Sequence, residues 1–179
     1  IDDDVVEVNK GMDMIDESLD KVNCKEKYMI EGNHDDWLNS FVEEFPYLPQ
    51  YKFKNIMSLK ERGYKYYPYG HLMHIGKLYF YHGGHYTTVN HTRQHVMNLG
   101  KNVLYGHTHD VQRQGVTHVD GAHHAWTLGC LKDMSKEKNA WLRGRETNWC
   151  HAFGIIDWFD DNNFRIDVID IHKGKTYVW

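Results

Sequence analysis

The sequence predicts an α/β fold in one domain over residues 1–179, more helical early in the chain and richer in strands later. Apolar residues three and four apart predict helices in the first part. Short alternating apolar runs bounded by turn residues predict strands in the second part. The chain is long enough to bury a real core, and no repeat or low-complexity segment divides it.

Three helices and one strand are predicted before Gly63. The first helix covers residues 5–22, where apolar residues are spaced 3, 4, 3, 4, 3, and the aspartates at 2–4 suit its start. A strand at residues 27–31 is followed by a helix at 35–45, which ends before two prolines. A helical patch at 55–62 ends at Gly63.

The rest of the chain is predicted to be mostly β. Residues 64–84, YKYYPYGHLMHIGKLYFYHGG, alternate and turn at Gly76-Lys77, which predicts a hairpin whose tyrosines pack rather than stack on bases. A helix at 91–99 closes at Gly100 and places His91 and His95 on one face. Further strands are expected at residues 102–106, 116–119, 123–128, 153–158 and 164–171, with turns at 160–163 and 173–174.

Composition narrows the class of protein. The net charge of −4 argues against a general electrostatic grip on nucleic acid or on anionic membranes. No apolar run is long enough for a transmembrane helix, and no signal peptide is visible. The three cysteines show no CxxC spacing, which favours a reducing, cytoplasmic setting.

Three segments share one design: YMIEGNH, LYFYHGG and NVLYGHTH are apolar strands that end in glycine and metal-binding side chains. In open α/β sheets the loops beyond the carboxyl ends of the strands line the ligand crevice. Three such loops on neighbouring strands are expected to converge. The residues brought together would be Asn33, His34, His82, His107 and His109.

The converging side chains form a mixed set of nitrogen and oxygen ligands. At the end of a strand, His107 and His109 would share one face and serve one metal ion or two adjacent ions. Such a set suits Mn, Fe, Co, Ni or Zn and suits Ca poorly. Each motif alone has a plainer explanation: GNHD as a helix N-cap, HGGH as a turn, and GHTH as a weak pattern.

The order GNHD, a strand ending in His-Gly, and GHTH resembles the calcineurin-like metallophosphoesterases. Residues 129–136, GCLKDMSK, and 148–158, NWCHAFGIIDW, resemble the prokaryotic and phage branch in particular. The resemblance covers nearly the whole chain. It implies a sandwich of two mixed β-sheets flanked by helices, and a site with two divalent transition-metal ions, manganese first among them.

The resemblance also implies a role for each matching residue. Asn33, His82 and His107 would bind the second metal ion, and His109 would reach the first. His34 would stabilise, and protonate, the leaving oxygen. The metal pair would clamp a phosphate ester and activate a water molecule for in-line attack.

Two earlier motifs of the family, Asp-x-His and Gly-Asp-x-x-Asp, do not occur in the sequence. We therefore expect this chain to be the later part of a longer phosphoesterase whose N-terminal strands are missing. Asp2, after Ile1, could be the last residue of the second motif or part of a plain N-cap run. Trp37 is a further departure, since related sequences often carry arginine there.

The predicted function is hydrolysis of phosphomonoesters or phosphodiesters through a dinuclear metal site with a metal-activated water. The predicted partner is a phosphate-ester substrate, with no membrane; nucleic acid enters only as a substrate, and the oligomeric state is left open. Two alternatives remain. One is a non-catalytic binding or scaffold module of the same fold that lost part of its metal site, and the other is a nuclease of the same family.

Overall fold

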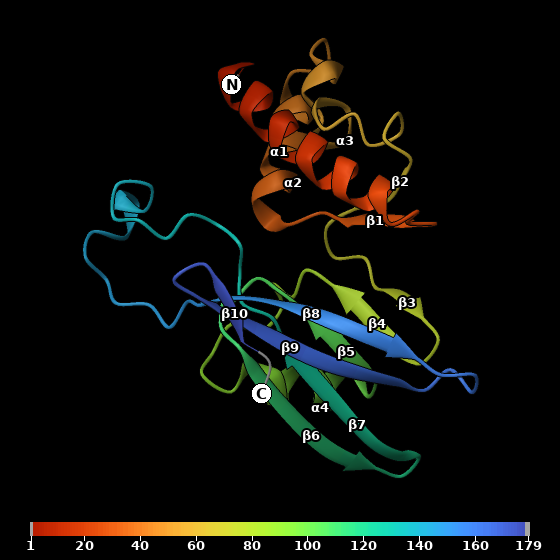
Figure 1. The fold of residues 1–179 in the computed structure, drawn as a ribbon. Helices are drawn as coiled ribbons and strands as arrows, with labels where there is room; N and C mark the ends of the chain where they lie inside the picture. Colours follow the sequence, from red (N-terminus) through yellow and green to blue (C-terminus); the bar gives the residue numbers. More distant parts are fainter. Residues whose placement is uncertain (1, 178–179) are drawn as a thin grey trace. The chain divides into compact units, whose positions relative to one another are not determined.

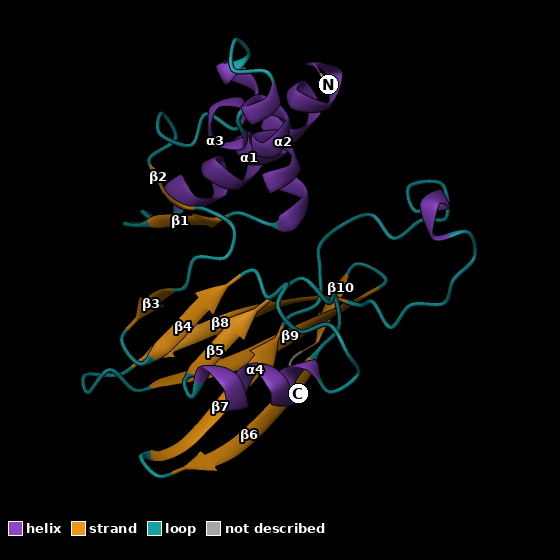
Figure 2. Ribbon diagram, turned by 180° about the vertical axis from the view of Figure 1, so that it is seen from behind, coloured by secondary structure: helices purple, strands orange, loops and turns teal. Residues whose placement is uncertain are grey.

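The computed structural model describes residues 2–177, so Ile1 and residues 178–179 lie outside the described part. Within it the chain has a mixed α/β fold with four α-helices and three β-sheets, which confirms the predicted α/β class (Figures 1 and 2). The predicted single domain comprises two compact units: the first ends at His71 and the second begins at Leu72.

The first unit packs helices against a two-stranded sheet. Its elements are α1 (Asp2–Lys21), β1 (Lys27–Ile30), α2 (Asn33–Glu44), a 3-10 turn (Pro49–Tyr51), α3 (Phe53–Ile56) and β2 (Tyr64–Tyr67). β1 and β2 are parallel, with Lys27 opposite Tyr64 and Ile30 opposite Tyr67. The core of the unit is the cluster of Met12, Phe53, Met57 and Leu59.

Arg62 ties α1 to the segment that follows α3. Its guanidinium donates to Asp13 Oδ1 at 2.6 Å and to Asp16 Oδ2 at 2.7 Å, while its Nε donates to the Met57 carbonyl at 3.1 Å. The apolar face of α1 contributes little to the core, because Met12 is the one buried residue of this helix in the described chain. The rest of the predicted apolar face is partly exposed, with Ile15 at 51%.

Three predictions for this unit need correction. α1 begins at Asp2, so the aspartates form its first turn, where negative charge suits the helix dipole. The helix predicted at 55–62 is wrong: α3 ends at Ile56 and turns follow, with Ser58 in the left-handed region at φ +49°. Residues 64–67 do not belong to the hairpin, because Pro68 lacks the N–H that a continuing strand needs and the chain then turns.

The second unit contains one helix and two sheets. Its elements are β3 (Met73–Ile75), β4 (Leu78–Tyr81), α4 (His91–Leu99), β5 (Asn102–Tyr105), β6 (Gln112–His118), β7 (Gly121–Thr127), a 3-10 turn (Ala140–Leu142), β8 (His151–Trp158), β9 (Phe164–His172) and β10 (Lys175–Tyr177). The mixed five-stranded sheet has the order β3-β4-β5-β7-β6, and the three-stranded antiparallel sheet has the order β10-β9-β8.

The five-stranded sheet is the middle layer of this unit, between α4 and the three-stranded sheet (Figure 2). Successive side chains of β5 point to opposite faces of the sheet. Val103 and Tyr105 pack in the cluster with Val96 of α4, whereas Leu104 packs toward Ile156 and Phe164. Each side of the sheet therefore has its own buried cluster, as expected for a strand covered on both faces.

Most element predictions for this unit are confirmed. The hairpin turns at Gly76-Lys77 with Ile75 opposite Leu78, and α4 ends at Gly100 in the left-handed region at φ +57°. Strands β6 to β9 are longer than predicted, and β10 was not predicted. No helix among residues 2–177 combines the length and apolarity needed to cross a membrane.

Candidate metal centre

His82 and His107 lie side by side at one edge of the five-stranded sheet. Their strands β4 and β5 are parallel neighbours with Tyr81 opposite Tyr105, so the residues that follow both strands emerge at the same edge. His107 Nδ1 lies 3.0 Å from His82 Nε2, and the ring centroids are 4.9 Å apart. The predicted convergence of these two histidines is confirmed.

The backbone of the GHTH loop is strained. His107 and His109 both adopt left-handed conformations, with φ of +59° and +61°. For a residue with a Cβ, that conformation costs on the order of 1–2 kcal/mol of conformational free energy. Such strained residues cluster at functional sites, where the surrounding structure holds them in place.

His107 and His109 lie beyond the end of β5. β5 ends at Tyr105 and both histidines have positive φ, so the strand alternation behind the expected shared face does not apply to residues 107–109. The His109 ring instead meets Trp149 edge to face, with centroids 4.8 Å apart. The His107 ring meets the His82 ring.

Gly83 allows the two strand ends to approach each other. A Cβ at this position would lie 2.4 Å from Cδ2 of Tyr105, and the backbone has φ +104°. Neither condition tolerates a side chain. Gly106 donates its N–H to the His82 carbonyl at 3.1 Å, which completes the contact between the two loops.

A buried polar network lies behind the loops. His91 Nε2 lies 3.1 Å from Asp110 Oδ2, and His91 Nδ1 contacts the Tyr105 hydroxyl. A carboxylate only accepts, so His91 donates from Nε2 to Asp110. This arrangement fixes the end of β5 two residues before His107.

Asp110 is 4% exposed, yet it is held as a carboxylate. Burial by itself would raise the pKa of Asp110, but hydrogen bonds led by those from Thr108 and His91 outweigh burial and lower it. Gln112 and Asn148 also donate to Oδ2, at 2.7 and 2.9 Å. A buried charge next to GHTH is therefore stabilised by protein donors.

His95 anchors β4 in the same way that His91 anchors β5. Its Nδ1 contacts the Tyr81 hydroxyl, and its Nε2 lies 3.2 Å from the Tyr86 carbonyl, so Nε2 carries the proton. Burial lowers the pKa of His95 to about 4, and the neighbouring His91 and His85 act in the same direction. The ring is neutral at physiological pH.

This lowered pKa predicts a loss of stability in mild acid. The unfolded chain binds the His95 proton near pH 6.5, whereas the folded chain binds it only near pH 4. The stability that the neutral His95 ring contributes to the folded state is fully present above pH 6.5. It is lost as the pH falls to 4, by on the order of 3 kcal/mol. Urea titrations at pH 7 and pH 4.5 should show a smaller drop in the free energy of unfolding for His95→Gln than for the wild type. Parallel losses in both proteins would contradict the assignment.

The segment at residues 148–150 holds the GHTH loop from the other side. Asn148 donates to Asp110, and the Cys150 N–H donates to the His109 carbonyl at 2.9 Å. The Cys150 carbonyl in turn accepts from the Cys130 N–H at 2.9 Å, and a Cβ on Gly129 would lie 2.4 Å from it. The NWC motif therefore hydrogen-bonds to the GHTH loop, and the GCL motif in turn hydrogen-bonds to NWC.

Asn33 and His34 belong to the first unit, in the first turn of α2. The plainer explanation of GNHD as a helix N-cap is confirmed for the motif: Gly32 is the N-cap, Asn33 is the first helical residue, and the Gly32 N–H donates to Asp35 Oδ2 at 2.9 Å. His34 is exposed and stacks on Trp37, with centroids 4.4 Å apart and planes 20° apart. β1, which leads to these residues, pairs with β2 and not with a strand of the larger sheet.

A buried carboxylate supports that turn. Glu31, fully buried just before Gly32, accepts from Asn39 Nδ2 at 2.5 Å and from the Tyr69 N–H at 3.0 Å. Both of its oxygens are therefore held by the unit itself. The turn that presents Asn33 and His34 is fixed from beneath.

The residues present fit the donor set of a transition metal. Within residues 2–177 no group of three or more His, Cys, Asp or Glu side chains could hold an ion, and the ligand pair that the geometry brings together is His82 and His107. Two imidazole nitrogens 3.0 Å apart can be adjacent ligands of one ion, since metal–nitrogen bonds are about 2.0–2.1 Å long. Sequence reasoning did not find Asp110, although its position directly after GHTH was a signal.

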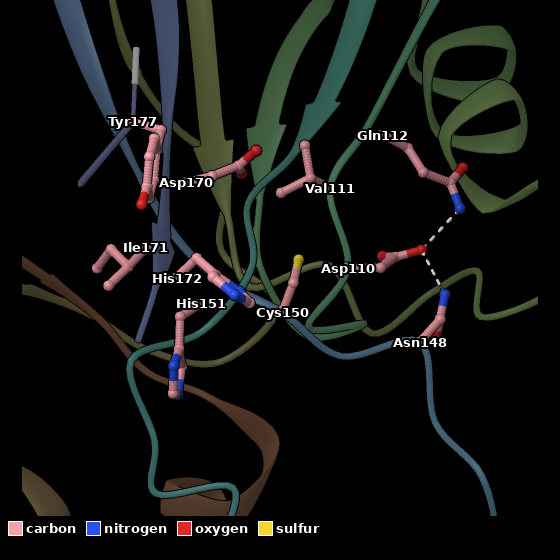
Figure 3. A pocket seen from close by; sticks show the side chains of 10 residues that line it. All are labelled: Asp110, Val111, Gln112, Asn148, Cys150, His151, Asp170, Ile171, His172 and Tyr177. Atoms are coloured by element: carbon pink, nitrogen blue, oxygen red, sulfur yellow. Dashed lines mark hydrogen bonds between the residues drawn. The ribbon is translucent and has the colours of Figure 1, made fainter. Parts of the chain in front are cut away.

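Two cavities of the second unit share Asp110, Gln112 and Asn148 in their walls. The first, of about 800 Å³, includes Cys150, whose thiol pKa is raised by burial, so a reactive thiolate is disfavoured (Figure 3). The second, of about 760 Å³, includes His107. Of these two cavities, the second is the one that has a member of the histidine pair, His107, in its wall.

Comparisons with known proteins add no name to this geometry. No family model matches the chain, and no curated protein matches it significantly. The functional reading therefore depends on the site itself.

Proposed function

We propose that the protein is a metal-dependent phosphoesterase of the calcineurin-like type, with a metallophosphoesterase-like sandwich as its fold. Of the two sheets in the second unit, however, only the five-stranded one is mixed and the three-stranded one is antiparallel, unlike the two mixed sheets expected. The observation that carries the proposal is the His82–His107 pair, which joins loops 25 residues apart at the ends of parallel strands. The strained backbone at His107 and His109 supports it.

The ligands of this proposal are Asn33, His82, His107 and His109, for two divalent transition-metal ions with manganese first. When bound, such a pair polarises a phosphate ester and lowers the pKa of an attacking water. The chain's own residues position the two histidine loops. Gly83 lets the loops meet, and the His91–Asp110 pair holds the end of β5. Three free cysteines favour action in the cytoplasm.

His34 is proposed to donate a proton from its imidazole to the leaving oxygen. It is exposed in the first turn of α2, and Trp37 holds one face of its ring. General-acid catalysis typically contributes about 10²–10⁴-fold. We therefore expect His34→Ala to lower the Mn²⁺-dependent hydrolysis of an aryl phosphate ester by the full-length protein by roughly 100-fold or more.

Metal content and a matched variant control this experiment. His34→Ala should keep its bound manganese, and His71→Ala, an exposed histidine of the same unit, should keep full activity. Full activity in His34→Ala would refute the role of His34.

A binding module that has shed its metals is the second candidate. It is favoured by the lack of a third His, Cys, Asp or Glu ligand beside the histidine pair within residues 2–177. Elemental analysis separates the two, because the module would bind none. A nuclease of the same family would share the chemistry, and competition between DNA and small esters would reveal it.

A further inference from the structure

The second cavity carries an arginine as well as a histidine. Arg145 lines the same 760 Å³ space as His107, together with Thr88 and Asn148, and all four belong to the second unit. Arg145 lies between β7 and β8 on residues 128–150, where the only regular structure described is a short 3-10 turn and one isolated bridge. Long segments of this kind in compact proteins are commonly functional.

The Arg145 guanidinium is available to a ligand. Among the ion pairs and side-chain hydrogen bonds of residues 2–177, none uses it, although Arg62 and Arg165 both pair with aspartates. The carboxylate in the same cavity wall, Asp110, is 4% exposed; its Oδ2 accepts from His91, Gln112 and Asn148, and its buried Oδ1 has no hydrogen-bond partner among the described residues. A planar cation without a partner beside an open cavity is suited to a phosphate oxygen.

Counting oxygens indicates which phosphate ester fits. A phosphodiester has two terminal oxygens and a single negative charge. A monoester has a third terminal oxygen and one more negative charge. Arg145 gives that oxygen a partner, so it distinguishes the two classes of substrate.

We infer that Arg145 binds the third phosphoryl oxygen and makes the enzyme selective for phosphomonoesters over phosphodiesters. The selectivity for phosphomonoesters rests on the proposed function, because it presupposes hydrolysis. The anion contact itself stands on the cavity and on the unpaired guanidinium.

The test compares p-nitrophenyl phosphate with bis(p-nitrophenyl) phosphate as substrates of the full-length protein. The wild type should prefer the monoester. Arg145→Gln should lower kcat/KM for the monoester by about 10- to 100-fold, mainly through KM, and change kcat/KM for the diester by less than about 3-fold. Arg145→Lys should keep more of the monoester activity than Arg145→Gln, because lysine retains the positive charge but lacks the paired N–H donors of the guanidinium.

Arg143→Gln is the matched control, since Arg143 lies on the same segment but does not line the cavity. It should leave both substrates unaffected. A wild-type preference for the diester, or an unchanged preference in Arg145→Gln, would overturn the inference while leaving the phosphoesterase proposal standing.

Binding of inorganic phosphate, followed by NMR with and without Mn²⁺, gives a readout that needs no turnover. Binding that is lost in Arg145→Gln but kept in Arg143→Gln supports the anion contact even if neither ester is hydrolysed, in which case the phosphoesterase proposal fails. Equal binding by the wild type and Arg145→Gln overturns the contact.

Discussion

Replacing His107 with alanine is expected to lower the affinity for Mn²⁺ by at least about 100-fold, because loss of a direct ligand costs no less than loss of an outer-shell partner. His107 Nδ1 lies 3.0 Å from His82 Nε2, so His82→Ala should have a similar effect. Hydrolysis of phosphate esters should fall with it. Titration with Mn²⁺, followed by calorimetry and by activity, measures both quantities.

His74→Ala provides the control, because His74 is an exposed histidine on β3 of the same unit. It should bind Mn²⁺ as the wild type does. If His107→Ala also keeps wild-type affinity and activity, the histidine pair is a structural hydrogen bond and nothing more.

Gly83→Ala is expected to destabilise the protein by about 3 kcal/mol or more. Two costs combine: the backbone has φ +104°, and the new Cβ would lie 2.4 Å from the Tyr105 ring. Tyr105 is buried against His91 and His95, so it has no free space to move into. Urea denaturation of the variant measures the loss, and Mn²⁺ affinity should fall as well, because the two loops are pushed apart.

Gly100→Ala separates the two costs. Gly100 also has a left-handed backbone, at φ +57°, but a Cβ there would meet nothing within 4 Å. It should cost only about 1–2 kcal/mol and leave Mn²⁺ binding intact. Equal losses in the two variants would show that close packing against Tyr105 is not what requires glycine at position 83.

The strands and the histidine pair were predictable because local patterns determine them. Alternation and the Gly76-Lys77 turn fix the hairpin. His82 and His107 each follow an apolar strand, and parallel neighbouring strands end at one edge. That juxtaposition needs only correct strand order.

What the sequence did not predict depends on non-local packing. The left-handed backbone at His109 lies against the Cys150 N–H and Trp149, which come from about 40 residues further along the chain. β2 pairs with β1 rather than joining the hairpin, and periodicity cannot distinguish those partners. His91 and His95 were placed correctly on one helix face, but their buried tyrosine partners were not apparent from that spacing.

The central claim is that His82 and His107 belong to a metal centre. Elemental analysis of the full-length protein, purified with Mn²⁺ and freed of loosely bound ions, tests it most directly. We expect about two transition-metal ions per chain in the wild type and fewer in His82→Ala and His107→Ala. A wild-type protein that retains no metal would contradict the account.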